Sequence, residues 1–347
     1  MVTLQRTHLV NGGAEDPTIE HVCEALQRAI QLELSTIPPY LYASYSLHST
    51  VNAEVLGILR SAVIEEMLHM VLAANVLNAL GGRPLVASED VVPSYPGHLP
   101  GGVEGQLMVR LRPFSLEQLM VFIEIEEPRD PIGIPEDEGP DEVGECTIGE
   151  FYTSIEQALM ELDDDDFIGD PARQIGPELM VGSVRVSDRD TAIEAISTII
   201  EQGEGSKGSP EHVHGTGEVH ELAHYYRFLQ IHHGRHLTRV DENRFEYIGG
   251  DLLIDADGLY ALPDDPSTLA HPEGSEERAL LRGFNLTYSA LLSTVQRLFD
   301  GEAHDQRFTE LLDQMHDLDR QARVMVAKAD REGIAIGPSF EYLSSTR

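Results

Sequence analysis

The stretch that decides the fold is Glu65-Glu66-Met67-Leu68-His69-Met70, which lies within a helical pattern predicted over 52–80. Gly81-Gly82, followed by Pro84, ends that pattern. With about 100° of rotation per residue, Glu66 falls near the centre of the apolar stripe, and His69 lies beside it. Glu65 falls well off that centre. Because a buried carboxylate is unfavourable unless it is paired or bound to a metal, the stretch predicts a helix that carries two ligands into a core.

The preceding helix, predicted from about 17 to 48, supplies a matching carboxylate. Glu33 lies at the middle of its apolar stripe, formed by Val22, Leu26, Ala29, Ile30 and Ile37. Pro38-Pro39 is expected to kink this helix. Two carboxylates facing inward from consecutive helices, together with a histidine, predict a metal site formed by Glu33, Glu66 and His69.

A second Glu-x-x-His pair, Glu221 and His224, lies in a helix predicted over 217–233. Residues three apart share a helix face, and carboxylate with imidazole suits iron, manganese or zinc. Two such pairs, each with one further glutamate, make a two-metal carboxylate centre. The fourth carboxylate stays open at this point. We take Glu204, with three rivals: Glu201, Glu126 and Glu127.

The remaining pattern predicts a mainly all-α protein built on a four-helix bundle with a long crossover. Residues 83–113 lack a helical period and are expected to form the crossover. Extra helices are predicted at 115–127, 148–162, 190–204, 275–300 and 304–330, and a small β-hairpin within 245–262. We expect a metal-binding bundle over 1–240 and a hairpin with two helices over 241–347, packed together as one structural unit.

The composition limits the partners. The formal net charge is −36, from 60 acidic and 24 basic residues, which argues against nucleic acid and anionic membranes because both need clustered positive charge. No apolar run approaches the roughly 18 residues of a membrane span, and the N-terminus does not resemble a signal peptide. Cys23 and Cys146 do not suggest a disulfide framework, so a cytoplasmic location is expected.

Several stretches resemble the ferritin-like domain of the iminophenyl-pyruvate dimer synthases of violacein- and rebeccamycin-type pathways. The similarity covers most of the chain and is carried by 29–42, 65–70, 202–205, 224–228 and 284–288. The resemblance implies a ferritin-like fold and a metal centre at Glu33, Glu66, His69, Glu204, Glu221 and His224. It also implies two transition-metal ions, with iron first and manganese or zinc as alternatives.

The function expected from the site and the resemblance is that of a di-iron carboxylate oxidoreductase in secondary metabolism. Its substrate would be a small organic molecule, such as an amino-acid-derived imine or keto acid, with dioxygen as a second partner. The sequence is compatible with a homodimer. In the pathway enzymes this domain is part of a much longer chain, so only the site and the redox class carry over. The alternatives are a ferroxidase-like metal-binding protein and a non-catalytic ferritin-like protein.

Overall fold

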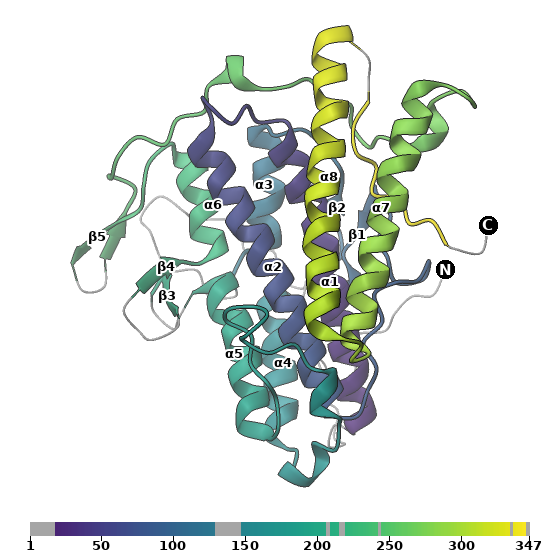
Figure 1. Ribbon diagram of the computed structural model, residues 1–347. Coiled ribbons are helices and arrows are strands. Elements are labelled where there is room, and N and C mark those ends of the chain that lie inside the picture. Colours follow the sequence, from purple (N-terminus) through teal and green to yellow (C-terminus); the bar gives the residue numbers. More distant parts are fainter. Residues whose placement is uncertain are drawn as a thin grey trace.

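The computed structural model describes residues 18–128, 147–205, 209–214, 219–241, 244–333 and 336–344 (Figure 1). Helices dominate this part of the chain: α1 (Ile19–Tyr45), α2 (Ala53–Ala79), α3 (Leu116–Ile125), α4 (Ile148–Met160), α5 (Arg189–Glu204), α6 (His224–His233), α7 (Glu276–Phe299) and α8 (His304–Glu332). Three antiparallel pairs of short strands accompany them: β1 (Gly97–His98) with β2 (Met108–Val109), β3 (Glu211–His214) with β4 (Val219–Leu222), and β5 (Thr238–Asp241) with β6 (Arg244–Glu246).

Helices α1 and α2 form the continuous half of the bundle and pack along each other. The hydroxyl of Thr18 caps the start of α1, where it accepts from the backbone N–H of His21, and the helix continues through Pro38-Pro39 to Tyr45. Most residues of both helices after the first turns are buried. A helix that is apolar on nearly all sides belongs in the centre of a protein, and this pair therefore forms the framework of the core.

The other half of the bundle consists of two interrupted helices. Helix α3 packs on α6, and α4 packs on α5. In Figure 1, α3 and α6 lie in the upper half of the bundle and α4 and α5 in the lower half. A capping box of Thr147 and Glu150 starts α4, and Gly205, with φ of 93°, ends α5.

The helix predicted over 217–233 begins later than expected. Residues Val219–Leu222 form strand β4, paired with β3, and α6 begins only at His224. The backbone N–H of Ala223, the residue between strand and helix, donates to the carbonyl of Pro210 at 2.9 Å. Glu221 and His224 consequently do not share a helical face.

The hairpin expected within 245–262 lies earlier in the chain, at 238–246, where β5 pairs with β6. Gly249 and Gly250 do not turn a second hairpin. Their backbone groups bond to His236 instead, with Gly249 N donating to His236 O at 2.9 Å and His236 N donating to Gly250 O at 3.0 Å.

The predicted crossover and C-terminal helices are present. Residues 83–113 contain β1, β2 and a short 3₁₀ turn but no α-helix. Helices α7 and α8 pack on each other and on the bundle, and their buried side chains, such as Phe284 and Met325, belong to the same hydrophobic core as α1 and α2. The mainly helical, ferritin-like bundle expected from the sequence is confirmed.

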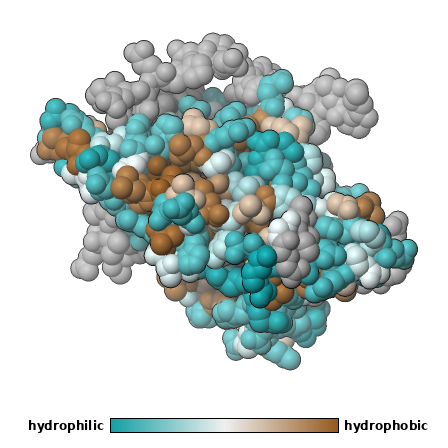
Figure 2. All heavy atoms as spheres, turned by 90° about the horizontal axis from the view of Figure 1, so that it is seen from above, coloured by the Kyte–Doolittle hydropathy of each residue, from teal (hydrophilic) through white to brown (hydrophobic). Residues whose placement is uncertain are grey.

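The face of the protein shown in Figure 2 is largely hydrophilic. Seen from above, apolar side chains gather in a limited area among polar ones (Figure 2). In the described part of the chain, Leu253, Ile168 and Leu269 are among the large apolar side chains that remain mostly exposed. No helix in that part is long and apolar enough to cross a membrane.

Candidate metal centre

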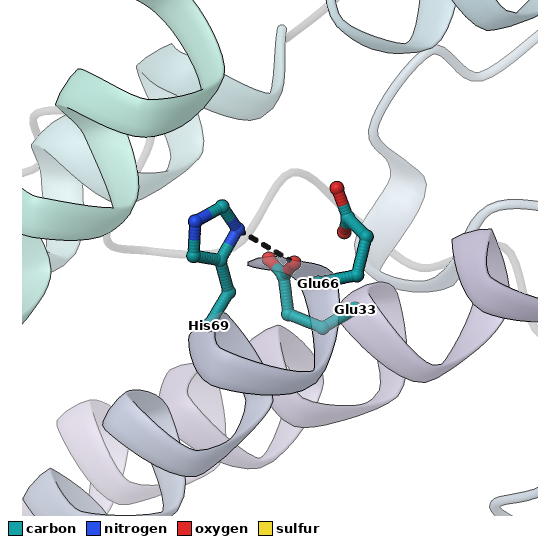
Figure 3. Close-up of side chains that lie close together, drawn as sticks. All are labelled: Glu33, Glu66 and His69. Atoms are coloured by element: carbon teal, nitrogen blue, oxygen red, sulfur yellow. Dashed lines mark ion pairs between the residues drawn. The ribbon is translucent and has the colours of Figure 1, made fainter. Parts of the chain in front are cut away.

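The first half of the site is formed by α1 and α2. Glu33 from α1 and Glu66 and His69 from α2 are all buried, and their polar ends converge (Figure 3). Nδ1 of His69 lies 3.4 Å from Oε2 of Glu33. The three residues that the helical face pattern predicts to share a site are therefore brought together in the structure.

The second half of the site comes from the two interrupted helices. His224 is the first residue of α6, and Glu126 caps the C-terminus of α3. Nδ1 of His224 lies 3.0 Å from Oε1 of Glu66 and 3.5 Å from Oε2 of Glu126. The rings of His224 and His69 stack with their centroids 5.4 Å apart. The interruption between α5 and α6 thus places an imidazole directly opposite α2.

These residues form two groups with the composition of metal sites. One contains Glu33, Glu66 and His69, the other Glu66, Glu126 and His224, and within each group the potential ligand atoms lie within 4.8 Å of one another. Glu66 belongs to both groups. Carboxylates combined with imidazole, with one carboxylate shared, match what adjacent iron or manganese ions require.

Hydrogen bonds from outside the cluster hold each carboxylate. The hydroxyl of Tyr152 in α4 donates to Oε1 of Glu33, and the hydroxyl of Tyr40 donates to Oε1 of Glu126 at 2.6 Å. Thr36 donates to Oε2 of Glu66 at 2.8 Å. Each carboxylate thus has one oxygen held by a hydroxyl.

The two imidazoles are oriented in the same way. Nε2 of His69 lies 2.9 Å from Oε1 of Gln202, and Nε2 of His224 lies 2.8 Å from Oε2 of Glu65. Since both of these partner atoms are acceptors, each Nε2 carries the proton, and Nδ1 is left to face the carboxylates.

This arrangement fits a bound cation. Nδ1 of His224 is fully buried and makes no hydrogen bond in the described part of the chain, although Oε1 of Glu66 is 3.0 Å away. An imidazole lone pair and carboxylate oxygens repel each other at this distance unless a second ring proton or a cation lies between them. The donor set supplies the ligands that a transition metal prefers.

The electrostatics reflect crowding of acids in a dry interior. Burial raises the pKa of Glu33 to about 7, against the hydrogen bonds from its neighbours, and burial together with Glu33 raises the pKa of Glu66. Burial lowers the pKa of His69. Burial also opposes the charged form of His224, but the carboxylates of Glu126, Glu65 and Glu66 outweigh it and raise its pKa.

Glu65 itself is paired with Arg227. Nη1 of Arg227 donates to Oε1 of Glu65 at 2.9 Å and to Oγ of Ser61 at 3.0 Å, while Nη2 contacts Oε2 of Glu65. Burial opposes ionisation of Glu65, but His224 and Arg227 outweigh it and hold its pKa well below the usual range. The carboxylate behind His224 is therefore ionised.

A small cavity of about 30 Å³ adjoins the cluster. The residues that follow α3, the start of α4 and the end of α5 line it, together with ligand-bearing residues of the cluster. Its apolar walls include Leu32, Ile148, Ile199 and Ile200. Glu204, the last residue of α5, also lines the cavity, and its carboxylate occupies the space that a Cβ on Gly149 of α4 would fill. Glu204 therefore reaches the cavity because position 149 carries no side chain.

The structure places the other predicted residues as follows. Glu221 is exposed on β4 and belongs to neither group of potential ligands, and Glu201 is exposed on α5. Glu127 lines the cavity beside Glu126. Gln202, Tyr152 and Arg227, which orient the cluster, were not predicted as site residues. Two of them carried a signal, since Gln202 lies in the motif around Glu204 and Arg227 follows His224 by three positions.

The architecture and the site define a class of protein, and the comparison with protein families agrees with it. The ferritin-like family model matches residues 26–233, so the chain belongs to the ferritin-like family. A ferritin-like protein of Caulobacter vibrioides superimposes with a TM-score of 0.63 at 21% identity, over 95% of this chain and 100% of that one. That likeness supports the fold.

Two curated relatives confirm the resemblance found in the sequence. The dichlorochromopyrrolate synthase of Lentzea aerocolonigenes is 24% identical over 95% of this chain and 36% of its own length. The 2-imino-3-(indol-3-yl)propanoate dimerase of Chromobacterium violaceum is 29% identical over 59% of this chain and 22% of its own length. The chain therefore spans about a third or less of the curated relatives it matches.

Proposed function

We propose that this protein is a two-metal carboxylate oxidoreductase, with iron as the metal and manganese or zinc as alternatives. Glu33 and His69 would hold one ion, Glu126 and His224 the other, and Glu66 would bridge them. Glu204 would complete the set as a fourth carboxylate beside the cavity, while Glu221 is left out because it lies exposed on β4.

The observation that carries the proposal is the orientation of the two histidines. Both Nε2 atoms have acceptors, and both Nδ1 atoms face a cluster of buried carboxylates from α1, α2 and α3. A structural role in packing requires no such convergence of two imidazoles on three buried carboxylates. Metal binding explains it, because a ligand histidine uses its other ring N–H to hold its orientation.

Bound metals would supply redox chemistry and a site at which dioxygen is reduced. The protein's own residues act on that site in definite ways. Tyr152 and Tyr40 hold the carboxylates of Glu33 and Glu126 by donating hydrogen bonds to them. The apolar walls of the cavity, such as Leu32 and Ile199, keep bulk water from the cluster.

We assign the substrate to small, amino-acid-derived imines or keto acids. The support is the similarity to the Chromobacterium violaceum relative, which is a dimerase of an indolyl imine. That protein is much longer than this chain, so the coupling reaction itself is not assigned.

A ferroxidase-like activity is the second candidate, and the cavity favours it. A volume of about 30 Å³ holds one or two water molecules, whereas a cavity that binds a benzene ring is roughly 150 Å³. An indole-sized substrate would require side chains such as Glu204 or Ile148 to move aside. Dioxygen would not.

Elemental analysis of freshly purified protein tests the metal centre, and two ions per chain are expected after anaerobic loading with ferrous iron. Spectra recorded on exposure of the ferrous protein to oxygen, with and without an indolyl keto acid and ammonium, then separate the two activities. Oxygen consumption that the organic substrate does not change would favour the ferroxidase. Less than about half an equivalent of metal after loading would contradict both.

A further inference from the structure

The two halves of the centre are closely matched, which makes one difference between them informative. Each half has its own glutamate, Glu33 or Glu126, held by a tyrosine hydroxyl, and both halves share Glu66. Each has one histidine whose Nδ1 faces the carboxylates. Within these two groups, to which Glu204 does not belong, the immediate donor atoms are therefore chemically equivalent.

The difference lies behind the histidines. Nε2 of His69 is bonded to a neutral amide oxygen of Gln202, which is 3% exposed. Nε2 of His224 is bonded to the carboxylate of Glu65. A carboxylate behind a ligand imidazole makes the ring a stronger donor to a metal than an amide does, because it stabilises the positive charge that the ring gains on binding.

Arg227 fixes this difference in place. It contacts both oxygens of Glu65 and also bonds Ser61 on α2, so the Glu65 carboxylate is held toward His224. Arg227 and His224 lie one turn apart on α6. The potential metal ligand and the arginine that holds Glu65 toward it therefore belong to the same helix. The described residues provide no corresponding ion pair at Gln202.

We infer that the two metal positions are unequal, and that the His224–Glu126 position binds its ion first and more tightly than the His69–Glu33 position. Glu65 and Gln202 are the positioning residues that set this order. The inference rests on the proposed function, since it concerns the same centre.

The test is a titration of the metal-free protein with Co²⁺, followed by calorimetry and by the visible absorption of the bound ion. Two binding steps are expected, separated by about tenfold or more. His224→Ala should remove the tighter step and His69→Ala the weaker one. Loss of the tighter step in His69→Ala, with its retention in His224→Ala, would overturn the order.

Exchange of the supporting residues isolates their contribution. Glu65→Gln should weaken the tighter step by about 10- to 100-fold, and Gln202→Glu should tighten the weaker step by about tenfold. Gln202→Glu is the more decisive variant, because a gain in affinity cannot come from damaged folding. An unchanged weaker step in Gln202→Glu would overturn the inference.

Helix α2 also offers a matched control. Glu54, at the start of α2, pairs with Nε2 of His236 at 2.8 Å near the surface, so Glu54→Gln removes the same kind of contact without touching the centre. Both Co²⁺ steps should stay as in the unmodified protein. Absence of all Co²⁺ binding would overturn the metal centre together with the order, whereas two steps in reversed order would overturn the order alone.

Discussion

Oε1 of Glu66 lies 3.0 Å from Nδ1 of His224, although the two residues belong to α2 and α6, far apart in the sequence. The other oxygen of Glu66 accepts a hydrogen bond from Thr36 on α1. Among the described residues, Glu66 is the member common to both potential ligand groups. The two halves of the centre are therefore joined through one carboxylate.

Glu66→Ala should accordingly abolish metal uptake at both positions. Loss of Glu33 or of Glu126, which belong to one group each, should leave the other metal position intact. Metal content after ferrous loading, measured per chain, is expected to fall from two equivalents to near zero. Glu221→Ala is the matched control, because Glu221 is exposed on β4 and should load as the unmodified protein does. Full loading of Glu66→Ala, or loss of metal in Glu221→Ala, would contradict the assignment.

The first half of the site could be predicted from the sequence because it depends on helix geometry alone. Glu33, Glu66 and His69 lie on long helices without interruption, where position along the chain fixes the face on which a side chain lies. The buried cluster of these three residues agrees with their predicted facing.

The second half could not be derived in that way, because both of its helices are interrupted at the site. Glu126 lies just after the last residue of α3, where a periodic stripe no longer defines direction. Glu221 was placed with His224 on the assumption of one continuous helix. Gly215-Thr216-Gly217, between the stretches that form β3 and β4, is a turn signal that could have revealed the hairpin.

The stability of the metal-free protein should depend on pH through Glu33. Its pKa is raised from 4.5 to about 7, so between these values the unfolded chain loses a proton that the folded chain keeps. The contribution of Glu33 to stability should therefore be fully present below about pH 4.5, decrease as the pH rises to about 7, and be absent above that, a change of about 3 kcal/mol in all.

The contribution of Glu33 is isolated by comparing unfolding in urea across this range for the unmodified protein and Glu33→Gln, both stripped of metal. Stability of the variant should decline much less over this range, because Gln does not titrate and no longer helps to raise the pKa of Glu66. Acids remote from Glu33 cancel in the difference. Glu221→Gln, at an exposed position, should retain the full decline. Parallel pH profiles for the unmodified protein and Glu33→Gln would refute the prediction.

Tyr152→Phe should destabilise the metal-free protein by about 1–3 kcal/mol, because it leaves the buried Glu33 without its hydroxyl donor. Tyr288→Phe is a suitable control. Tyr288 is also buried, but its hydroxyl makes no hydrogen bond in the described part of the chain, so its loss should change stability by less than about 0.5 kcal/mol. Thermal unfolding of both variants checks the difference, and equal effects would indicate that the bond to Glu33 is unimportant.

Gly149→Ala tests whether Glu204 occupies the space beside α4. Alanine favours a helix over glycine by up to about 1 kcal/mol, but here its Cβ would displace the Glu204 carboxylate. The substitution should therefore be neutral or destabilising in the unmodified protein and stabilising in Glu204→Ala, where the space is free. Unfolding in urea of the single and double variants gives the free energy of interaction between positions 149 and 204, which is expected to be about 1 kcal/mol.

The same cycle also reports on the role of Glu204 in metal binding. If Glu204 turns toward the metals when they bind, it leaves the space beside Gly149, and the coupling should shrink in Co²⁺-loaded protein because the added Cβ then meets no carboxylate. A coupling that stays the same with and without Co²⁺ would mean that Glu204 remains beside α4. The fourth carboxylate would then have to be sought at Glu127, which lines the same cavity.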